Sequence, residues 1–169
     1  MTDKLGYTPA NIANFFLEKG KEENVEITAM KLQKIVYIAY GWTLALLNTK
    51  LFDEPIEAWQ HGPVIPSLFH EFKHFGKHNI TEKALSIDWD EGTFVPAAIP
   101  TNDEKLLTVL TKVWDIYKVF TGWDLRQRTH QDGTPWSQVY KPGERFVLIP
   151  DDIMKPSFEK NITELLSAA

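Results

Sequence analysis

The chain has 169 residues and a formal net charge of −5 at pH 7, and 43% of its residues are hydrophobic. An acidic chain without a long basic stretch is not typical of nucleic-acid-binding proteins, which present a basic face to the phosphates, so nucleic acid is not an expected partner. The chain has no cysteine, which excludes disulfides, thiolate nucleophiles and thiolate-bound zinc.

Two helices are expected in the first third of the chain. Thr8 and Pro9 give a start signal, an N-cap hydroxyl before a first-turn proline, and Gly20 is a stop signal. A second helix is expected over residues 28–47, with a threonine N-cap and a polar first turn. Its stretch 35–47 is uncharged and nearly all apolar, so it has no solvent face and should lie at the centre of the core.

A surface loop and a third helix are expected next. Residues 51–66 contain too many prolines for a helix, and a loop held on a rigid scaffold is a common place for function. The third helix should start at Pro66 or Ser67 and end at Gly76. Its apolar face is expected to consist of Leu68, Phe69, Phe72 and Phe75.

The second half of the chain is expected to be helical after an irregular segment. Residues 77–100 contain turn and helix-breaking residues and predict an irregular, partly exposed excursion. A fourth helix should begin near Thr101 or Asn102 and end near Phe120. The further expected elements are a short helix over 123–129, a helical restart at Thr134-Pro135, a short strand over 146–149 and a helix over 151–166 that Pro156 breaks or kinks.

These elements predict a mainly α fold with a few short extended segments. No linker divides the chain into two cores, so residues 1–169 should form a single compact helical domain with no separate accessory domain. No signal peptide is visible, and the run 35–47 is too short to cross a bilayer. We therefore expect a cytoplasmic protein without a membrane partner.

The sharpest local motif is His-Glu-Phe-Lys-His at residues 70–74, a literal match to the zinc motif H-E-x-x-H. On a helix, His70 and His74 share one face and can hold zinc, with Glu71 as general base. A third protein ligand is missing from the pattern, and Lys73 places a cation beside the proposed site. A solvated helix face is the simpler interpretation. We predict no metal centre, no cofactor and no catalytic residue, and keep a zinc hydrolase at His70 and His74 as an alternative.

Three segments identify a family. Residues 30–42 read MKLQKIVYIAYGW, residues 51–59 read LFDEPIEAW, and residues 61–66 read HGPVIP. With Thr129-His130 and Pro135-Trp136 further on, their order and spacing resemble the Panacea domain, also known as the SocA-like antitoxin domain or the GepA-like phage-associated proteins. The resemblance covers roughly Pro9 to Ile162.

The resemblance implies a helical domain that acts as the antitoxin of a two-gene toxin–antitoxin system and is not an enzyme. It implies that a cognate protein toxin is neutralised by direct protein contact; toxins of this family include small alarmone synthetase-like enzymes. The SocA type implies an alternative, an adaptor that delivers its toxin to the ClpXP protease. His61 is a departure, because an aromatic residue such as tyrosine is expected before the Gly-Pro pair.

We predict the partner-binding surface in residues 52–66 and at the start of the third helix. Aromatic anchors would supply most of the binding energy, and acidic residues would complement a basic nucleotide-binding cleft on a toxin. The candidate contacts are Phe52, Asp53, Glu54, Glu57, Trp59 and His61.

Overall fold

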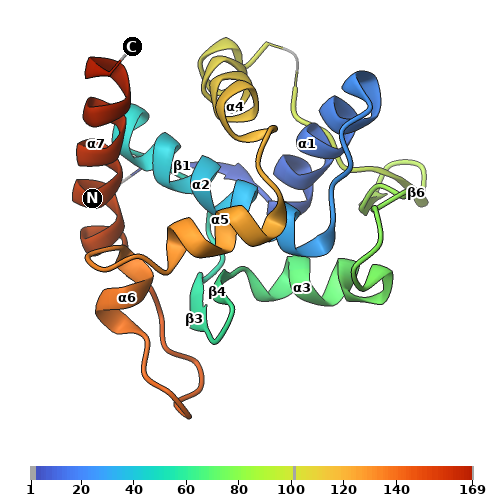
Figure 1. Ribbon diagram of the computed structural model, residues 1–169. Helices are drawn as coiled ribbons and strands as arrows, with labels where there is room; N and C mark the ends of the chain where they lie inside the picture. Colours follow the sequence, from blue (N-terminus) through green and yellow to red (C-terminus); the bar gives the residue numbers. More distant parts are fainter. Residues whose placement is uncertain (1–2, 101, 169) are drawn as a thin grey trace.

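The structure is a computed structural model that describes residues 3–100 and 102–168. Over these residues it is mainly α, as predicted, with helices gathered around a central one (Figure 1). The helices are α1 (Pro9–Glu23), α2 (Ala29–Leu47), α3 (Pro66–Phe72), α4 (Glu104–Tyr117), α5 (Gly122–Thr129), α6 (Pro135–Val139) and α7 (Asp151–Ser167), with a 3₁₀ turn η1 (Lys73–Phe75) after α3. Among the described residues, no helix combines the length and the apolar character that crossing a membrane requires.

Helix α2 is the centre of the core, as its uncharged run predicts. Every residue from 31 to 44 is buried, and α1, α4, α5 and α7 all pack against this helix (Figure 1). The expected N-cap is present, because the Thr28 side chain accepts a hydrogen bond from the backbone N–H of Lys31. Gly41 allows α7 to approach closely, since a Cβ atom there would lie 2.2 Å from the ring of Phe158.

In the part of the chain that the structure describes, three two-stranded sheets complete the fold. Strands β1 (Asp3–Tyr7) and β2 (Thr49–Phe52) pair in parallel and join the beginning of the chain to the end of α2. Strands β3 (Glu57–Trp59) and β4 (Gly62–Val64) form an antiparallel hairpin directly before α3. Strands β5 (Leu85–Asp88) and β6 (Thr93–Pro96) form a second antiparallel hairpin.

The segment 77–100 is more regular than expected. It contains the β5–β6 hairpin, whose large side chains are mostly exposed, including Trp89 at 84% and Phe94 at 72% exposure. The base of the hairpin is tied to α1, because the buried amide of Asn14 donates to the backbone oxygens of Ala84 and Ala97. The apolar and polar residues do alternate in β5, but each strand is only four residues long and is flanked by turn residues, so the periodicity is too short to stand out in the sequence.

Two helix ends and one strand also differ from expectation. The fourth helix begins at Glu104 with Asp103 as N-cap, and Thr101 lies outside the described residues. Helix α7 continues through Pro156, which lacks the N–H that would donate to the backbone oxygen of Asp152, an exposed residue. Residues 146–149 form no strand; they make an isolated bridge between Leu148 and β3.

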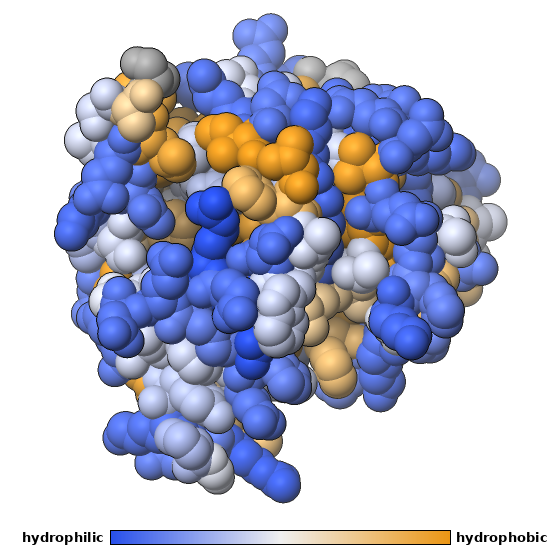
Figure 2. All heavy atoms as spheres, viewed as in Figure 1, coloured by the Kyte–Doolittle hydropathy of each residue, from blue (hydrophilic) through white to orange (hydrophobic). Residues whose placement is uncertain are grey.

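The surface is uneven in character. On the face shown in Figure 2, hydrophobic residues gather over α4 and α1, whereas the protruding segment between α6 and α7 is mostly hydrophilic. The β3–β4 hairpin and α3 lie at the lower edge of the same view, next to the start of α2 (Figure 1). Of the predicted partner-binding residues, Glu57 and Trp59 lie in β3 of this hairpin and His61 lies in its turn.

Candidate functional site: the groove between the β3–β4 hairpin and α3

Polar side chains at the start of α2 fasten the hairpin to the core. The side-chain amide of Gln33 bonds to both backbone groups of Ile65, donating to its oxygen at 3.0 Å and accepting from its N–H at 2.9 Å. The amine of Lys34 donates to the backbone oxygen of Pro63 at 2.9 Å. Both side chains are buried, so what looks in sequence like a polar first turn is an internal clamp on β4 and the start of α3.

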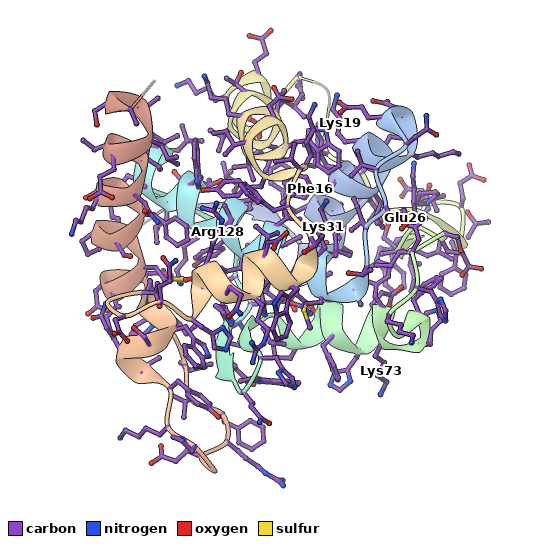
Figure 3. All side chains as sticks on the ribbon, viewed as in Figure 1. Phe16, Lys19, Glu26, Lys31, Lys73 and Arg128 are labelled. Atoms are coloured by element: carbon purple, nitrogen blue, oxygen red, sulfur yellow. The ribbon has the colours of Figure 1, made fainter. Side chains whose placement is uncertain are left out.

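Lys31 is a third buried side chain of this turn, and it bonds to the segment after α4 instead of the hairpin. Its amine donates to the backbone oxygen of Lys118, just after α4, at 2.6 Å. In Figure 3, Lys31 lies at the centre of the molecule near α5, whereas Lys73 projects from the far end of α3. The first turn of α2 therefore organises two separate regions, the hairpin and the connection between α4 and α5.

Aromatic residues from the second half of the chain fix the hairpin from its other side. The indole N–H of Trp136 in α6 donates to the backbone oxygen of Trp59 at 2.7 Å. The His130 ring lies 3.9 Å from the Trp136 ring and makes a 3.1 Å hydrogen bond with the backbone oxygen of Gln60. The segments Thr129-His130 and Pro135-Trp136, which form part of the family resemblance, thus hold the hairpin in place.

A groove of about 470 Å³ opens between the hairpin and α3. The indole of Trp59 and the ring of Phe69 meet edge to face at 5.0 Å, which joins the two sides of the groove. Trp59 is itself oriented by a 2.6 Å hydrogen bond from its indole N–H to the carboxylate of Glu57. The lining includes Lys34, Trp59, His61, Leu68, Phe69 and Phe72. It is largely apolar, with few polar groups, as in many binding sites.

The structure brings two of the predicted partner contacts to this groove, namely Trp59 and the exposed His61. Phe52 is fully buried against Tyr40, with ring centroids 4.9 Å apart, so it has no surface to offer a partner. Glu57 is 8% exposed and is engaged by Trp59. Asp53 and Glu54 lie in the connection between β2 and β3 and do not line the groove.

His70 and His74 do not have the geometry that the zinc motif requires. Helix α3 ends at Phe72, and His74 lies in the 3₁₀ turn, where side chains four residues apart no longer share a face. Each ring packs on its neighbour, His70 on Phe69 and His74 on Phe75. Within the described ranges, no cluster of three or more His, Asp or Glu side chains is placed to hold a metal ion. The zinc-hydrolase alternative gains no support from this arrangement.

Lys34 is the most unusual charged group of the site, and sequence reasoning missed it. It is 2% exposed, and burial lowers the pKa of its amine from 10.5 to about 7, with a further lowering by the Arg126 guanidinium. A Cβ atom on Gly62 would lie 2.9 Å from the Lys34 amine and 3.0 Å from the Thr129 hydroxyl. Gly62 also has φ +107°, a conformation that favours glycine, so both the backbone and the close packing require glycine at this position.

A helical scaffold that carries a largely apolar groove has the form expected of a protein that binds another molecule on a concave surface. Residues 32–137 match the family model described as "Antitoxin SocA-like, Panacea domain", and the chain belongs to this family. Antitoxin SocA of Caulobacter vibrioides is 27% identical over 151 residues, which cover 87% of this chain and 80% of that relative. No solved structure matches the chain. The family resemblance seen in the sequence is confirmed.

Proposed function

We propose that this protein is a cytoplasmic antitoxin that neutralises a cognate protein toxin by direct contact and has no catalytic activity of its own. Membership of the SocA-like Panacea family is the observation that carries the proposal, because it supports an antitoxin role and implies a toxin partner. We also propose that residues 1–169 act as one domain, since the helices from both halves of the chain pack on α2.

The groove between the β3–β4 hairpin and α3 is the proposed contact surface. All of its lining residues except Ala29 and Met30 lie inside the segment that matches the family. Buried polar side chains fasten the backbone of the hairpin at Pro63 and Ile65, and Glu57 orients Trp59. Rigid aromatic side chains beside a preformed groove are typical of interface anchors. Trp59 and His61 are the retained contacts, and Asp53 and Glu54 are proposed to contribute only charge at the periphery.

Co-expression with the product of the neighbouring gene tests the antitoxin role. We expect that product to stop growth when expressed alone, and growth to return when this protein is present. The two proteins should co-purify, and the amount of toxin should remain constant. If the neighbour is harmless alone, or remains toxic in the presence of this protein, the proposal fails. If the toxin is a small alarmone synthetase-like enzyme, formation of its nucleotide product should stop in the purified complex.

The adaptor alternative makes a different prediction. An antitoxin that delivers its toxin to ClpXP should shorten the half-life of the toxin, and only when ClpXP is present. Similarity to Antitoxin SocA is the observation that favours testing the adaptor mode. A toxin half-life that is the same with and without ClpXP excludes the adaptor mode and leaves sequestration.

The non-enzymatic proposal has its own test. Protein purified without a histidine tag should contain far less than one zinc ion per chain, and Glu71→Gln should leave neutralisation unchanged. Stoichiometric zinc that is lost on substitution of His70 would instead support the hydrolase alternative.

A further inference from the structure

The groove has a charge pattern opposite to that of the whole chain. The protein has a net charge of −5, yet none of the described residues that line the groove is acidic. Its ionisable members are Lys34 in α2, Lys73 in η1 and His61 in the hairpin. An occupant that matches this lining combines apolar surface with negative charge.

Lys34 also has unused hydrogen-bonding capacity. An ammonium group has three donors, and the described residues give this one a single acceptor, the backbone oxygen of Pro63. Nearby Arg126 stacks on Trp123, and its Nε atom is buried without a hydrogen-bond partner. Among the described residues neither cation forms an ion pair. A buried cation without a counter-charge is costly, so an arriving anion relieves that cost.

We propose that the groove binds a carboxylate carried beside a large apolar side chain, on one segment of a protein partner. The apolar side chain packs against Trp59, Leu68 and Phe69, and the carboxylate accepts a hydrogen bond from the amine of Lys34. The inference rests on the proposed function in that the partner is taken to be the toxin. The groove chemistry can nevertheless be measured without the toxin.

A carboxylate fits this site better than a phosphate group does. Burial keeps the pKa of Lys34 near 7, so the site offers at most one charge from that amine, between apolar walls. The lining residues Lys73 and His61 are exposed and Arg126 does not line the groove, so a doubly charged group at the buried amine would remain largely uncompensated. The Asp or Glu side chain of a peptide brings one charge and, in the neighbouring residue, the apolar surface that the groove is built to cover.

Blocked tripeptides provide the first test. Acetyl-Phe-Asp-Phe-amide and its neutral counterpart acetyl-Phe-Asn-Phe-amide are titrated into the full-length protein, and binding is followed by NMR at the indole N–H of Trp59. We expect the acidic peptide to bind about tenfold more tightly, the effect of one hydrogen bond to a charged group. Equal affinities, or shifts that leave Trp59 unchanged, would overturn the proposal.

Two lysine variants on the same helix identify the responsible charge. Lys34→Met should bring the two peptide affinities to the same value. Lys31→Met is the matched control, because Lys31 is also buried but donates to Lys118 and does not line the groove. It should retain the tenfold preference. A preference that survives Lys34→Met contradicts the proposal.

A pH titration of the wild-type protein gives a test that does not depend on folding of a variant. A carboxylate binds the charged form of Lys34, whose pKa is about 7 when free, so binding above pH 7 must take up a proton. The acidic peptide should therefore lose about tenfold or more in affinity between pH 6 and pH 8.5. The other basic groups beside this amine or in the lining are Arg126, Lys73 and His61. His61→Gln should keep the loss, and an affinity independent of pH would overturn the proposal.

Other outcomes assign the groove differently. A concentration-dependent dimer that Lys34→Met dissociates would assign the groove to a second copy of the chain and overturn the peptide proposal. A neighbouring gene product that is harmless would refute the antitoxin role, yet leave the peptide preference standing. Equal peptide binding together with full neutralisation would refute the groove chemistry alone.

Discussion

The side chain of Gln33 supplies backbone hydrogen bonds at the start of α3. Its amide pairs with both backbone groups of Ile65, the N-cap residue of α3, which has no side-chain cap of its own. A leucine of similar size would leave the backbone N–H of Ile65 buried without its partner, whereas the Ile65 oxygen would keep the hydrogen bond from the N–H of Phe69. Gln33→Leu should therefore lower the free energy of unfolding by about 1–3 kcal/mol, measured by urea denaturation. Gln127→Ala, at an exposed position of α5, should cost less than about 0.5 kcal/mol. Equal effects of the two substitutions would contradict the clamp.

The buried amine of Lys34 predicts a dependence of stability on pH. Its pKa is about 7 in the folded protein and 10.5 in an unfolded chain. Between these values the unfolded state binds more protons, so the free energy of unfolding rises with pH, by up to about 1.4 kcal/mol per unit. Below pH 7 both states are charged and this contribution is constant. The rise in the free energy of unfolding ends near pH 10. Burial raises the pKa of Tyr37, so above that pH this tyrosine ionises in the unfolded chain first and lowers the free energy of unfolding.

Urea denaturation at pH 7, 8 and 9 measures this slope. Lys34→Met should remove most of it, and the remainder is expected from Lys31, whose pKa is also lowered by burial. The exposed Lys112 serves as the control, because its replacement by methionine should leave the slope as in the wild type. A slope that Lys34→Met does not change would place the titrating group elsewhere.

These clamps show a limit of sequence reasoning at the residue scale. Lys31, Gln33 and Lys34 have side chains that usually face water, and their partners lie between 29 and 87 positions further along the chain. No local pattern contains that information. The exposure of His61 and the groove position of Trp59 agree with a functional loop, but Phe52 in the same loop is fully buried, because β2 places it against the core.

At the element scale, helices with local start signals were predictable and non-local pairings were not. Thr8, Thr28 and Thr134 were recognisable as N-caps, and each side chain accepts a hydrogen bond from the helix that follows. The parallel pair of β1 and β2 joins segments more than forty residues apart, and neither strand shows an apolar alternation of its own. Helix α3 ends at Phe72, where the chain tightens into the 3₁₀ turn η1 that leads to the predicted stop at Gly76. Phe69 is 38% exposed, so the apolar residues of α3 do not form one buried face.

The contact between α2 and α7 gives a prediction at the same scale. A Cβ atom on Gly41 would lie 2.2 Å from the ring of Phe158, so Gly41→Ala must displace α7 or its ring. We expect a loss of about 1–3 kcal/mol in the free energy of unfolding. In a Phe158→Ala background the same substitution should be neutral or stabilising by up to about 1 kcal/mol, because alanine favours the helix. The same cost in both backgrounds would show that Gly41 matters for another reason.

At the scale of the whole molecule, the segment that matches the family ties the core to the groove. It begins in α2, includes the hairpin and α3, and ends in α6, whose Trp136 holds the hairpin. Many residues that identify the family, Lys34 and Trp136 among them, thus position the groove, and the side chains with exposed surface there are few. A toxin is expected to contact a small set of residues that a large, buried set keeps rigid.

If a few exposed groove residues make the contact, substitutions there should weaken toxin binding more than substitutions elsewhere on the surface. Trp59→Ala should weaken binding to the toxin by about tenfold to a hundredfold, measured by calorimetry with the purified neighbour, because an anchoring ring is lost from the groove. Trp89→Ala is the matched control, since Trp89 is 84% exposed on the separate β5–β6 hairpin; it should change the affinity by less than about threefold. His61→Ala gives a second reading at an exposed position that does not disturb the core. A larger loss at Trp89 than at Trp59 would move the contact surface to the β5–β6 hairpin, and the groove would then have to serve another ligand.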